Sequence, residues 1–193
     1  MIANFILIGL TSYLLGSIPF GVIMGKLWGG VDIRAGGSGH SGALNTWRMV
    51  GLAPAIIAAL GDIAKALVAV KVAQVYGINE WAIVVAVPLV IAGHCWPVFL
   101  RFQGGMGLAT ACISLFYLSP LIMVIMLAVW GGWALVLRHA PRATGASALT
   151  LPVIIWLLGE PSYMLVLGVI AGGLIFVRHV PDFGRVYRRF WLD

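Results

Sequence analysis

Apolar runs long enough to cross a lipid bilayer recur from one end of this 193-residue chain to the other. In the hydrocarbon layer backbone N–H and C=O groups must pair with each other, so only helices or a closed β-barrel can span it. The runs are continuous and lack the alternation of apolar and polar residues found in barrel strands, so they predict helices. Hydrophobic residues make up 62% of the chain and charged residues 9%, which excludes an ordinary soluble domain.

Seven transmembrane helices are predicted, which makes the fold class an all-α polytopic membrane protein. The spans cover residues 2–24, 51–76, 81–100, 107–119, 120–137, 146–158 and 162–177. The fourth and sixth are too short to cross a hydrocarbon layer of about 30 Å at about 1.5 Å per residue, so polar loops are expected to dip into the bilayer beside them. The first span has no basic leading segment and is expected to stay in place rather than be removed as a signal peptide. A single integral membrane domain over residues 1–193 is therefore expected.

Basic residues gather in the loops on one side of these spans. The loops are residues 25–50, 101–106, 138–145 and 178–193, and their basic residues include Lys26, Arg34, Arg48, Arg101, Arg138, Arg142, Arg178, Arg185, Arg188 and Arg189. The opposite loops carry acidic residues, Glu80 and Glu160. Because positively charged loops stay in the cytoplasm, the amino terminus is expected outside and the carboxyl terminus inside, with the glycine-rich loops cytoplasmic.

Charge and cysteine content exclude other classes of protein. The formal net charge of +6 does not indicate a nucleic-acid partner, because so short and apolar a chain leaves no room for a soluble basic domain. The two cysteines, Cys95 and Cys112, lie at or inside predicted helices and show neither the spacing of a metal site nor a paired framework. We therefore expect inert cysteines and no metal.

A polar stretch between the first two spans has the composition of an anion site. Residues 36–39 read Gly-Gly-Ser-Gly, a run that lets backbone N–H groups converge on a phosphate, with Arg48 supplying charge. The glycines alone are equally well explained by a tight re-entry loop or a close helix contact. The polar residues Ser38, His40 and Asn45 are hard to explain by packing, so they favour phosphate binding.

A second glycine cluster, Phe-Gln-Gly-Gly-Met-Gly at residues 102–107, leads directly into the fourth span. Its N–H groups, with the positive end of the helix dipole behind them, predict a second seat for an anion. His94 and Arg101 flank it. A helix that simply starts after a turn would also explain these glycines, and a lone histidine at a helix end is more often a structural hydrogen-bonding group.

A third cluster, Arg-His-Val-Pro-Asp-Phe-Gly-Arg at residues 178–185, follows the last span. Histidine exchanges protons near neutral pH and arginine binds phosphate oxygens in pairs, so His179 is a candidate proton acceptor among anion-binding groups. Arg185, Arg188 and Arg189 are also explained by membrane topology or by contacts with anionic lipids.

Two opposite charges, Asp62 and Lys65, stand three residues apart within the second span and on one face of the helix. At that depth such charges must pair with each other or be hydrated. We favour a structural role for the pair over a catalytic one.

With these clusters the chain resembles the bacterial membrane glycerol-3-phosphate acyltransferases that use acyl phosphate as donor, the PlsY family. The resemblance covers essentially the whole chain, including the number of spans and their orientation. Three motifs carry it: first Asp32-Ile33-Arg34, Gly37-Ser38-Gly39, Gly42-Ala43, Asn45 and Arg48, then Gly93-His94, Pro97-Val98-Phe99, Phe102, Gly104-Gly105, Gly107 and Ala109-Thr110, and last Arg178-His179 and Arg185.

The resemblance implies transfer of a fatty acyl group from acyl phosphate to the 1-hydroxyl of glycerol 3-phosphate, giving lysophosphatidic acid and phosphate. The setting is phospholipid synthesis in the bacterial cytoplasmic (inner) membrane, among membrane lipids and with no cofactor. His179 is then the base or the group that orients the hydroxyl, and Ser38 is either a nucleophile or a phosphate ligand. The implied substrate-binding residues are Gly37, Gly39, His40, Asn45, Arg48, His94, Arg101, Gly104, Gly105, Gly107, Thr110, Arg142, Arg178, Asp182 and Arg185.

The chain departs from the family pattern at positions that bear on phosphate binding. Where the second motif normally has lysines, this chain has Gln103 and Met106. The first motif has His40 and Leu44 in place of asparagine and threonine, and the third has Asp182 in place of asparagine. Two cationic groups are lost and one anionic group is gained.

Other functions fit parts of this pattern. A diverged paralogue would use another acyl donor or acceptor, and a non-catalytic homologue would keep the fold without the chemistry. An anion transporter is the alternative from a different class, because short helices with inward glycine loops also build transport sites. No inverted repeat is visible in the sequence, which argues against the transporter.

Overall fold

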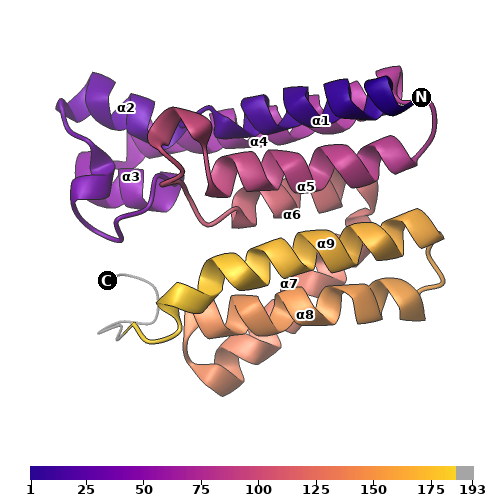
Figure 1. Ribbon diagram of the computed structural model, residues 1–193. Helices are drawn as coiled ribbons and strands as arrows, with labels where there is room; N and C mark the ends of the chain where they lie inside the picture. The colour runs from indigo at the N-terminus through magenta and orange to yellow at the C-terminus, as the bar shows by residue number, and fades with distance from the viewer. Residues whose placement is uncertain (186–193) are drawn as a thin grey trace. The chain divides into compact units, whose positions relative to one another are not determined.

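The computed structural model describes residues 1–185, so Arg188 and Arg189 lie outside the described part of the chain. Within residues 1–185 the chain forms helices and no β-strand (Figure 1). The α-helices are α1 (Ile2–Ser17), α2 (Phe20–Gly29), α3 (Ala43–Val50), α4 (Leu52–Tyr76), α5 (Trp81–Cys95), α6 (Leu108–Leu118), α7 (Pro120–Leu137), α8 (Ala140–Leu157) and α9 (Ser162–His179). Short 3-10 turns are η1 (Ile33–Ala35), η2 (Val98–Leu100) and η3 (Val180–Asp182).

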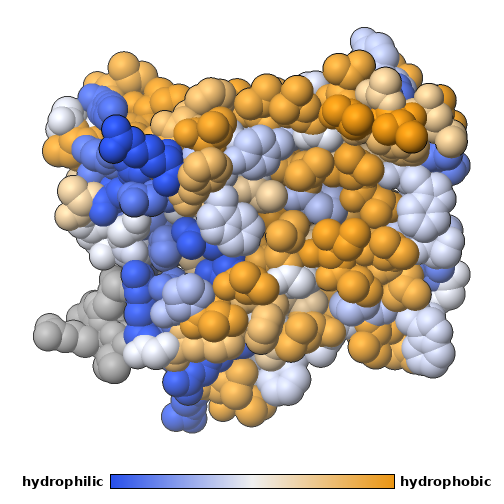
Figure 2. Space-filling model, viewed as in Figure 1, coloured by the Kyte–Doolittle hydropathy of each residue, from blue (hydrophilic) through white to orange (hydrophobic). Residues whose placement is uncertain are grey.

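The predicted all-helical membrane fold is confirmed, and each predicted span coincides with one or more of these helices. Segments that are long and apolar enough to cross a bilayer are Ile2–Gly29, Trp81–Leu100, Pro120–Leu137 and Ser162–Asp182, and α6 is a shorter apolar helix. Figure 2 shows apolar side chains over most of the visible helix flanks and hydrophilic ones gathered near α2 and α3. The flanks are therefore suited to contact with lipid.

The structure corrects the outline of the first span and of the loop that follows it. The predicted helix at residues 2–24 is broken at Ile18 and Pro19 into α1 and α2, because proline has no N–H with which to continue α1. The predicted loop at residues 25–50 contains the eight-residue helix α3. The polar residues of the first motif therefore lie partly on a helix.

The helix over the sixth predicted span begins earlier than the sequence predicts. Helix α8 begins at Ala140 and has 18 residues, so most of the loop expected at residues 138–145 is helical. His139 stabilises this early start because its ring accepts the backbone N–H of Arg142, and Pro141 occupies the first turn, where a missing N–H does no harm. The first turns of α8 contain polar residues, so the apolar pattern of the sequence indicates a span only from residue 146.

The chain divides into two compact units, Met1–Ile113 and Ser114–Asp193. In the first unit α1 packs along α5, while α2 and α3 pack against α4. A Cβ atom at Gly16 would collide with the carbonyl of Val90, and one at Gly93 with the carbonyl of Tyr13. Glycine at these two positions therefore lets the backbones of α1 and α5 come close together.

In the second unit α8 packs against both α7 and α9. The indole N–H of Trp130 donates to the hydroxyl of Thr144 at 3.0 Å, which links α7 to α8. The turn η3 contacts α8, and the ring of His139 contacts the carbonyl of Arg185 at 2.8 Å. The start of α8 and the end of α9, where His179 lies, are thus held at the same end of this unit.

Candidate functional site

The first glycine loop, residues 36–42, takes its shape from the buried side chain of Asn45 in α3. The Nδ2 atom of Asn45 donates to the carbonyls of Ile33 at 2.7 Å, His40 at 2.9 Å and Gly36 at 3.2 Å. Its Oδ1 atom accepts the backbone N–H of Ser38 at 2.8 Å. One amide side chain therefore fixes the loop at several points.

This geometry changes the interpretation of the first motif. The N–H of Ser38 bonds to Asn45 and the N–H of Gly39 bonds to the carbonyl of Gly36 at 3.1 Å, so both groups are used within the loop. Gly37 has φ +58° and a Cβ there would collide with the Asn45 amide, which explains that glycine by packing. Direct substrate contacts by Asn45, Gly37 and Gly39 stay a prediction, as do those of Ser38, His40 and Arg48.

An ion pair lies at the start of this loop. The Nε atom of Arg34 contacts Asp32 Oδ1 at 3.0 Å and its NH2 atom contacts Asp32 Oδ2 at 2.7 Å, a two-bond fork. The hydrogen bond from Arg34 holds the pKa of the Asp32 carboxyl below its ordinary value, although partial burial opposes the shift. The NH1 atom of Arg34 reaches the carbonyls of Leu100 at 3.3 Å and Gln103 at 3.4 Å. Arg34 thus joins the first motif to the second.

The second glycine loop, residues 97–107, contains two consecutive left-handed residues. Arg101 has φ +53° and Phe102 has φ +64°. For a residue with a Cβ this conformation costs about 1–2 kcal/mol. The N–H of Phe102 bonds to the carbonyl of Pro97 at 2.9 Å, which closes the turn between them. The loop is therefore built with local strain just before its glycines.

The glycines that follow pack closely against His94. The N–H of Gly105 bonds to the carbonyl of His94 at 3.0 Å, and a Cβ at Gly105 would collide with the ring of His94. A Cβ at Gly104 would collide with the same carbonyl. The Gly105 N–H is therefore used within the protein, and substrate binding by Gly105 stays a prediction. Substrate binding by Gly104, Gly107 and Arg101, and by Thr110 buried in α6, stays a prediction.

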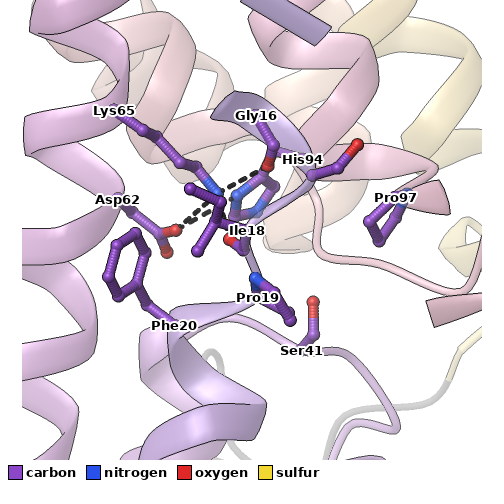
Figure 3. Close-up of a pocket in the computed structure, with 10 residues that line it drawn as sticks. Gly16, Ile18, Pro19, Phe20, Ser41, Asp62, Lys65, His94 and Pro97 are labelled. Atoms are coloured by element: carbon purple, nitrogen blue, oxygen red, sulfur yellow. Dashed lines mark hydrogen bonds and ion pairs between the residues drawn. The ribbon is translucent and has the colours of Figure 1, made fainter. Parts of the chain in front are cut away.

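Figure 3 shows a buried polar cluster of Asp62, Lys65 and His94. The Nζ atom of Lys65 donates to Asp62 at 2.7 Å and to the carbonyls of Gly16 at 2.9 Å and Ile18 at 3.1 Å. These three acceptors match the three N–H donors of an ammonium group. The Nδ1 atom of His94 lies 3.4 Å from the same carboxylate oxygen.

This cluster supports the structural interpretation of the Asp62–Lys65 pair. Lys65 contacts the carbonyls at the break between α1 and α2, where Pro19 supplies no N–H. The hollow around the cluster leaves no space for a water molecule. His94 faces the cluster with one ring nitrogen, and its predicted contact with substrate stays a prediction.

The third motif lies in the second unit. His179 is 4% exposed, and its Nδ1 atom lies 2.7 Å from the carbonyl of Ile175. A carbonyl only accepts hydrogen bonds, so Nδ1 carries a hydrogen and Nε2 carries the lone pair when the ring is neutral. The neutral ring therefore has its lone pair on Nε2, as the predicted role of proton acceptor requires, and that role stays a prediction.

Cationic side chains of the second unit are held around the same end. Arg142 donates to the carbonyl of Phe183 at 2.9 Å, and Arg185 pairs with Asp182 at 3.1 Å. The negative charge of Asp182 is therefore compensated by Arg185. Arg178 lies in the last turn of α9, next to His179. Within residues 1–185 no group of three or more His, Cys, Asp or Glu side chains could hold a metal ion.

A sequence profile of the family described as Glycerol-3-phosphate acyltransferase matches residues 6–189. The chain belongs to this glycerol-3-phosphate acyltransferase family. Proteins named glycerol-3-phosphate acyltransferase are 33% identical over 183 residues in Desulforamulus reducens, covering 95% of this chain and 92% of that protein, and 35% identical over 174 residues in Rubrobacter xylanophilus, covering 90% and 87%.

A solved structure of an acyltransferase of this kind has the same fold. The crystal structure of PlsY (YgiH), described as an integral membrane glycerol 3-phosphate acyltransferase in its glycerol 3-phosphate form, superposes with a TM-score of 0.81. It is 32% identical and covers 94% of this chain and 90% of that chain. Its lysophosphatidic acid form gives a TM-score of 0.80.

Sequence reasoning missed one residue of this acyltransferase that joins two motifs. The sequence places Arg34 in the first motif and in a basic cytoplasmic loop, but predicts no contact between it and the second motif. The spacing Asp-x-Arg at residues 32–34 is a signal for a local ion pair, whereas the contacts with Leu100 and Gln103 cross 66 and 69 residues of sequence.

Proposed function

We propose that this protein moves a fatty acyl group from an acyl phosphate to the 1-hydroxyl of glycerol 3-phosphate. The hydroxyl oxygen bonds to the acyl carbon, the bond from that carbon to phosphate breaks, and the hydroxyl proton leaves, so the products are lysophosphatidic acid and inorganic phosphate. Membership of the family over nearly the whole chain carries the proposal. A solved relative described in glycerol 3-phosphate and lysophosphatidic acid forms supports the choice of acceptor and product.

The proposed roles follow from the chemistry of the donor. An acyl phosphate is already activated, so the protein has to orient the hydroxyl, accept its proton and stabilise the phosphate that leaves. His179 takes the proton on Nε2 or orients the hydroxyl. Ser38 and Arg48 bind phosphate, and Arg142 and Arg178 supply further positive charge.

A direct assay tests this proposal. The purified protein is incubated in detergent micelles with palmitoyl phosphate and glycerol 3-phosphate, and lysophosphatidic acid and free phosphate are measured together. Both products are expected in equal amounts, and palmitoyl coenzyme A is expected to be inactive as donor. Phosphate release without lysophosphatidic acid would indicate a hydrolase or a different acceptor. The absence of both products would support the non-catalytic homologue.

Substitution of Met106 tests whether the site is adapted to a substrate that carries a charged phosphate group. Methionine cannot donate a hydrogen bond to phosphate, so Met106→Lys is expected to raise kcat/KM about tenfold or more, because a hydrogen bond to a charged group contributes roughly 1.5–3 kcal/mol. Met106→Leu is the matched control and should change little. If the lysine variant is no better than the wild type, the site is adapted to a less highly charged substrate or does not use charge at this position.

The orientation in the membrane is part of the proposal. As a single integral membrane domain of residues 1–193 in a bacterial cytoplasmic membrane, the protein has its amino terminus outside and its carboxyl terminus in the cytoplasm, because basic loops stay inside. In a variant with Cys95 and Cys112 replaced by alanine, Glu80→Cys and Glu160→Cys are expected to react with a membrane-impermeant maleimide on intact spheroplasts. Reaction only after lysis would invert the orientation.

A further inference from the structure

The guanidinium of Arg34 contacts two segments that are far apart in the sequence. Its Nε and NH2 atoms form the fork with Asp32, and its NH1 atom donates to the carbonyls of Leu100 at 3.3 Å and Gln103 at 3.4 Å. The fork fixes the plane of the guanidinium, so the direction of NH1 is fixed as well. The ion pair therefore aims one donor at the second glycine loop.

The two carbonyls that Arg34 contacts lie on either side of the strained pair. Arg101 and Phe102 are both left-handed, with φ of +53° and +64°, and neither is glycine. Such a conformation persists only when surrounding contacts hold it. The N–H of Gln103 also bonds to the carbonyl of Leu100 at 3.2 Å, which closes the turn from inside the loop. Arg34 holds the same turn from another segment.

We propose that Arg34 is a positioning residue that maintains the strained Arg101-Phe102 turn and so sets the conformation of the second glycine loop. This inference rests on the proposed function and on the predicted binding of glycerol 3-phosphate by residues of that loop. Asp32 holds the Arg34 fork in place, and the fork holds the carbonyls of Leu100 and Gln103. Loss of Arg34 releases the turn, and the loop then spends part of its time in conformations that do not bind substrate.

A double-mutant cycle tests this role. Arg34→Met is expected to raise the Kd for glycerol 3-phosphate, measured by calorimetry in nanodiscs, about tenfold, which corresponds to about 1.4 kcal/mol. Phe102→Gly removes the penalty at one of the two strained positions and so reduces the need for support, because glycine adopts positive φ readily. In the Phe102→Gly background Arg34→Met is therefore expected to raise the Kd about threefold or less. An equal loss in both backgrounds would show that Arg34 acts by its charge alone and would overturn the inference.

Two further variants separate geometry from charge. Lys26→Met removes an exposed positive charge from the end of α2, near Asp32, and is expected to leave the Kd unchanged. Arg34→Lys keeps the charge but cannot form the fork and the two carbonyl contacts together, so it is expected to behave like Arg34→Met. Wild-type affinity in Arg34→Lys would contradict the proposal.

Hydrogen exchange gives a readout that needs no substrate. In Arg34→Met the backbone N–H groups of Phe102 and Gln103 are expected to exchange about tenfold faster, because their bonds close the turn, while peptides from α4 and α5 report whether the fold is kept. Unchanged exchange at these positions would overturn the inference even if the enzyme is active. If the wild type neither binds glycerol 3-phosphate nor forms product, the proposed function fails, and the exchange result still decides the role of Arg34.

Discussion

Replacing His179 by alanine is expected to lower kcat for acyl transfer by about 10²- to 10⁴-fold, the range that a general acid or base typically contributes. The buried ring donates from Nδ1 to the carbonyl of Ile175, so in the proposed reaction Nε2 is the ring nitrogen that would accept the proton of the substrate hydroxyl. The measurement is the initial rate of lysophosphatidic acid formation at saturating substrates. The KM for acyl phosphate should change much less than kcat.

A conservative variant distinguishes catalysis from structure. The amide of asparagine can place an N–H near the position of Nδ1, so His179→Asn can keep the bond to Ile175 while it removes Nε2. If His179 is the base, His179→Asn folds like the wild type and is as inactive as His179→Ala. Substantial activity in His179→Asn would show that the histidine only anchors the end of α9, and that the substrate phosphate or water takes the proton.

The sequence predicts the helices of this protein well because lipid imposes a simple rule on the backbone. Every apolar run of spanning length became a helix, and Ser119-Pro120 was found as a boundary between α6 and α7. The predicted helix boundaries are wrong where polar residues occur inside helices. The first turns of α8 and the whole of α3 are polar enough to resemble loops. The break at Pro19 is accompanied by a tertiary contact with Lys65, and no local sequence pattern shows that contact.

The candidate site was predicted less completely than the fold. Glycine and polar residues indicated where the loops lie, but not how their N–H groups are used. Those of Ser38, Gly39 and Gly105 bond within the protein, because a loop that is partly buried must satisfy its own backbone. Asn45 and Arg34 hold these loops through contacts that depend on three-dimensional placement, and residue type alone could not distinguish such a role from substrate binding.

Replacing Lys65 by methionine is expected to destabilise the protein by roughly 3–5 kcal/mol, because breaking a buried ion pair leaves one charge without compensation. Lys65 is 4% exposed and Asp62 is 3% exposed, so water cannot solvate the carboxylate that has lost its partner. Methionine has a similar length and no donor, so the contacts with Asp62, Gly16 and Ile18 are all lost. The measurement is the free energy of unfolding in mixed micelles titrated with SDS.

Two more variants separate the charge of Lys65 from its contacts with the break between α1 and α2. Lys71→Met removes an exposed lysine from the same helix and is expected to lower the free energy of unfolding much less than Lys65→Met does, because no buried charge is left uncompensated. The double variant Asp62→Asn with Lys65→Met no longer buries an unpaired carboxylate, yet the carbonyls of Gly16 and Ile18 lose the Lys65 donor, and Ile18 keeps only the N–H of Phe20 at 3.2 Å. It should therefore recover part of the loss and remain roughly 1–3 kcal/mol less stable than the wild type. Full recovery would mean that Lys65 serves only to neutralise Asp62, and that the break at Pro19 is stable without it.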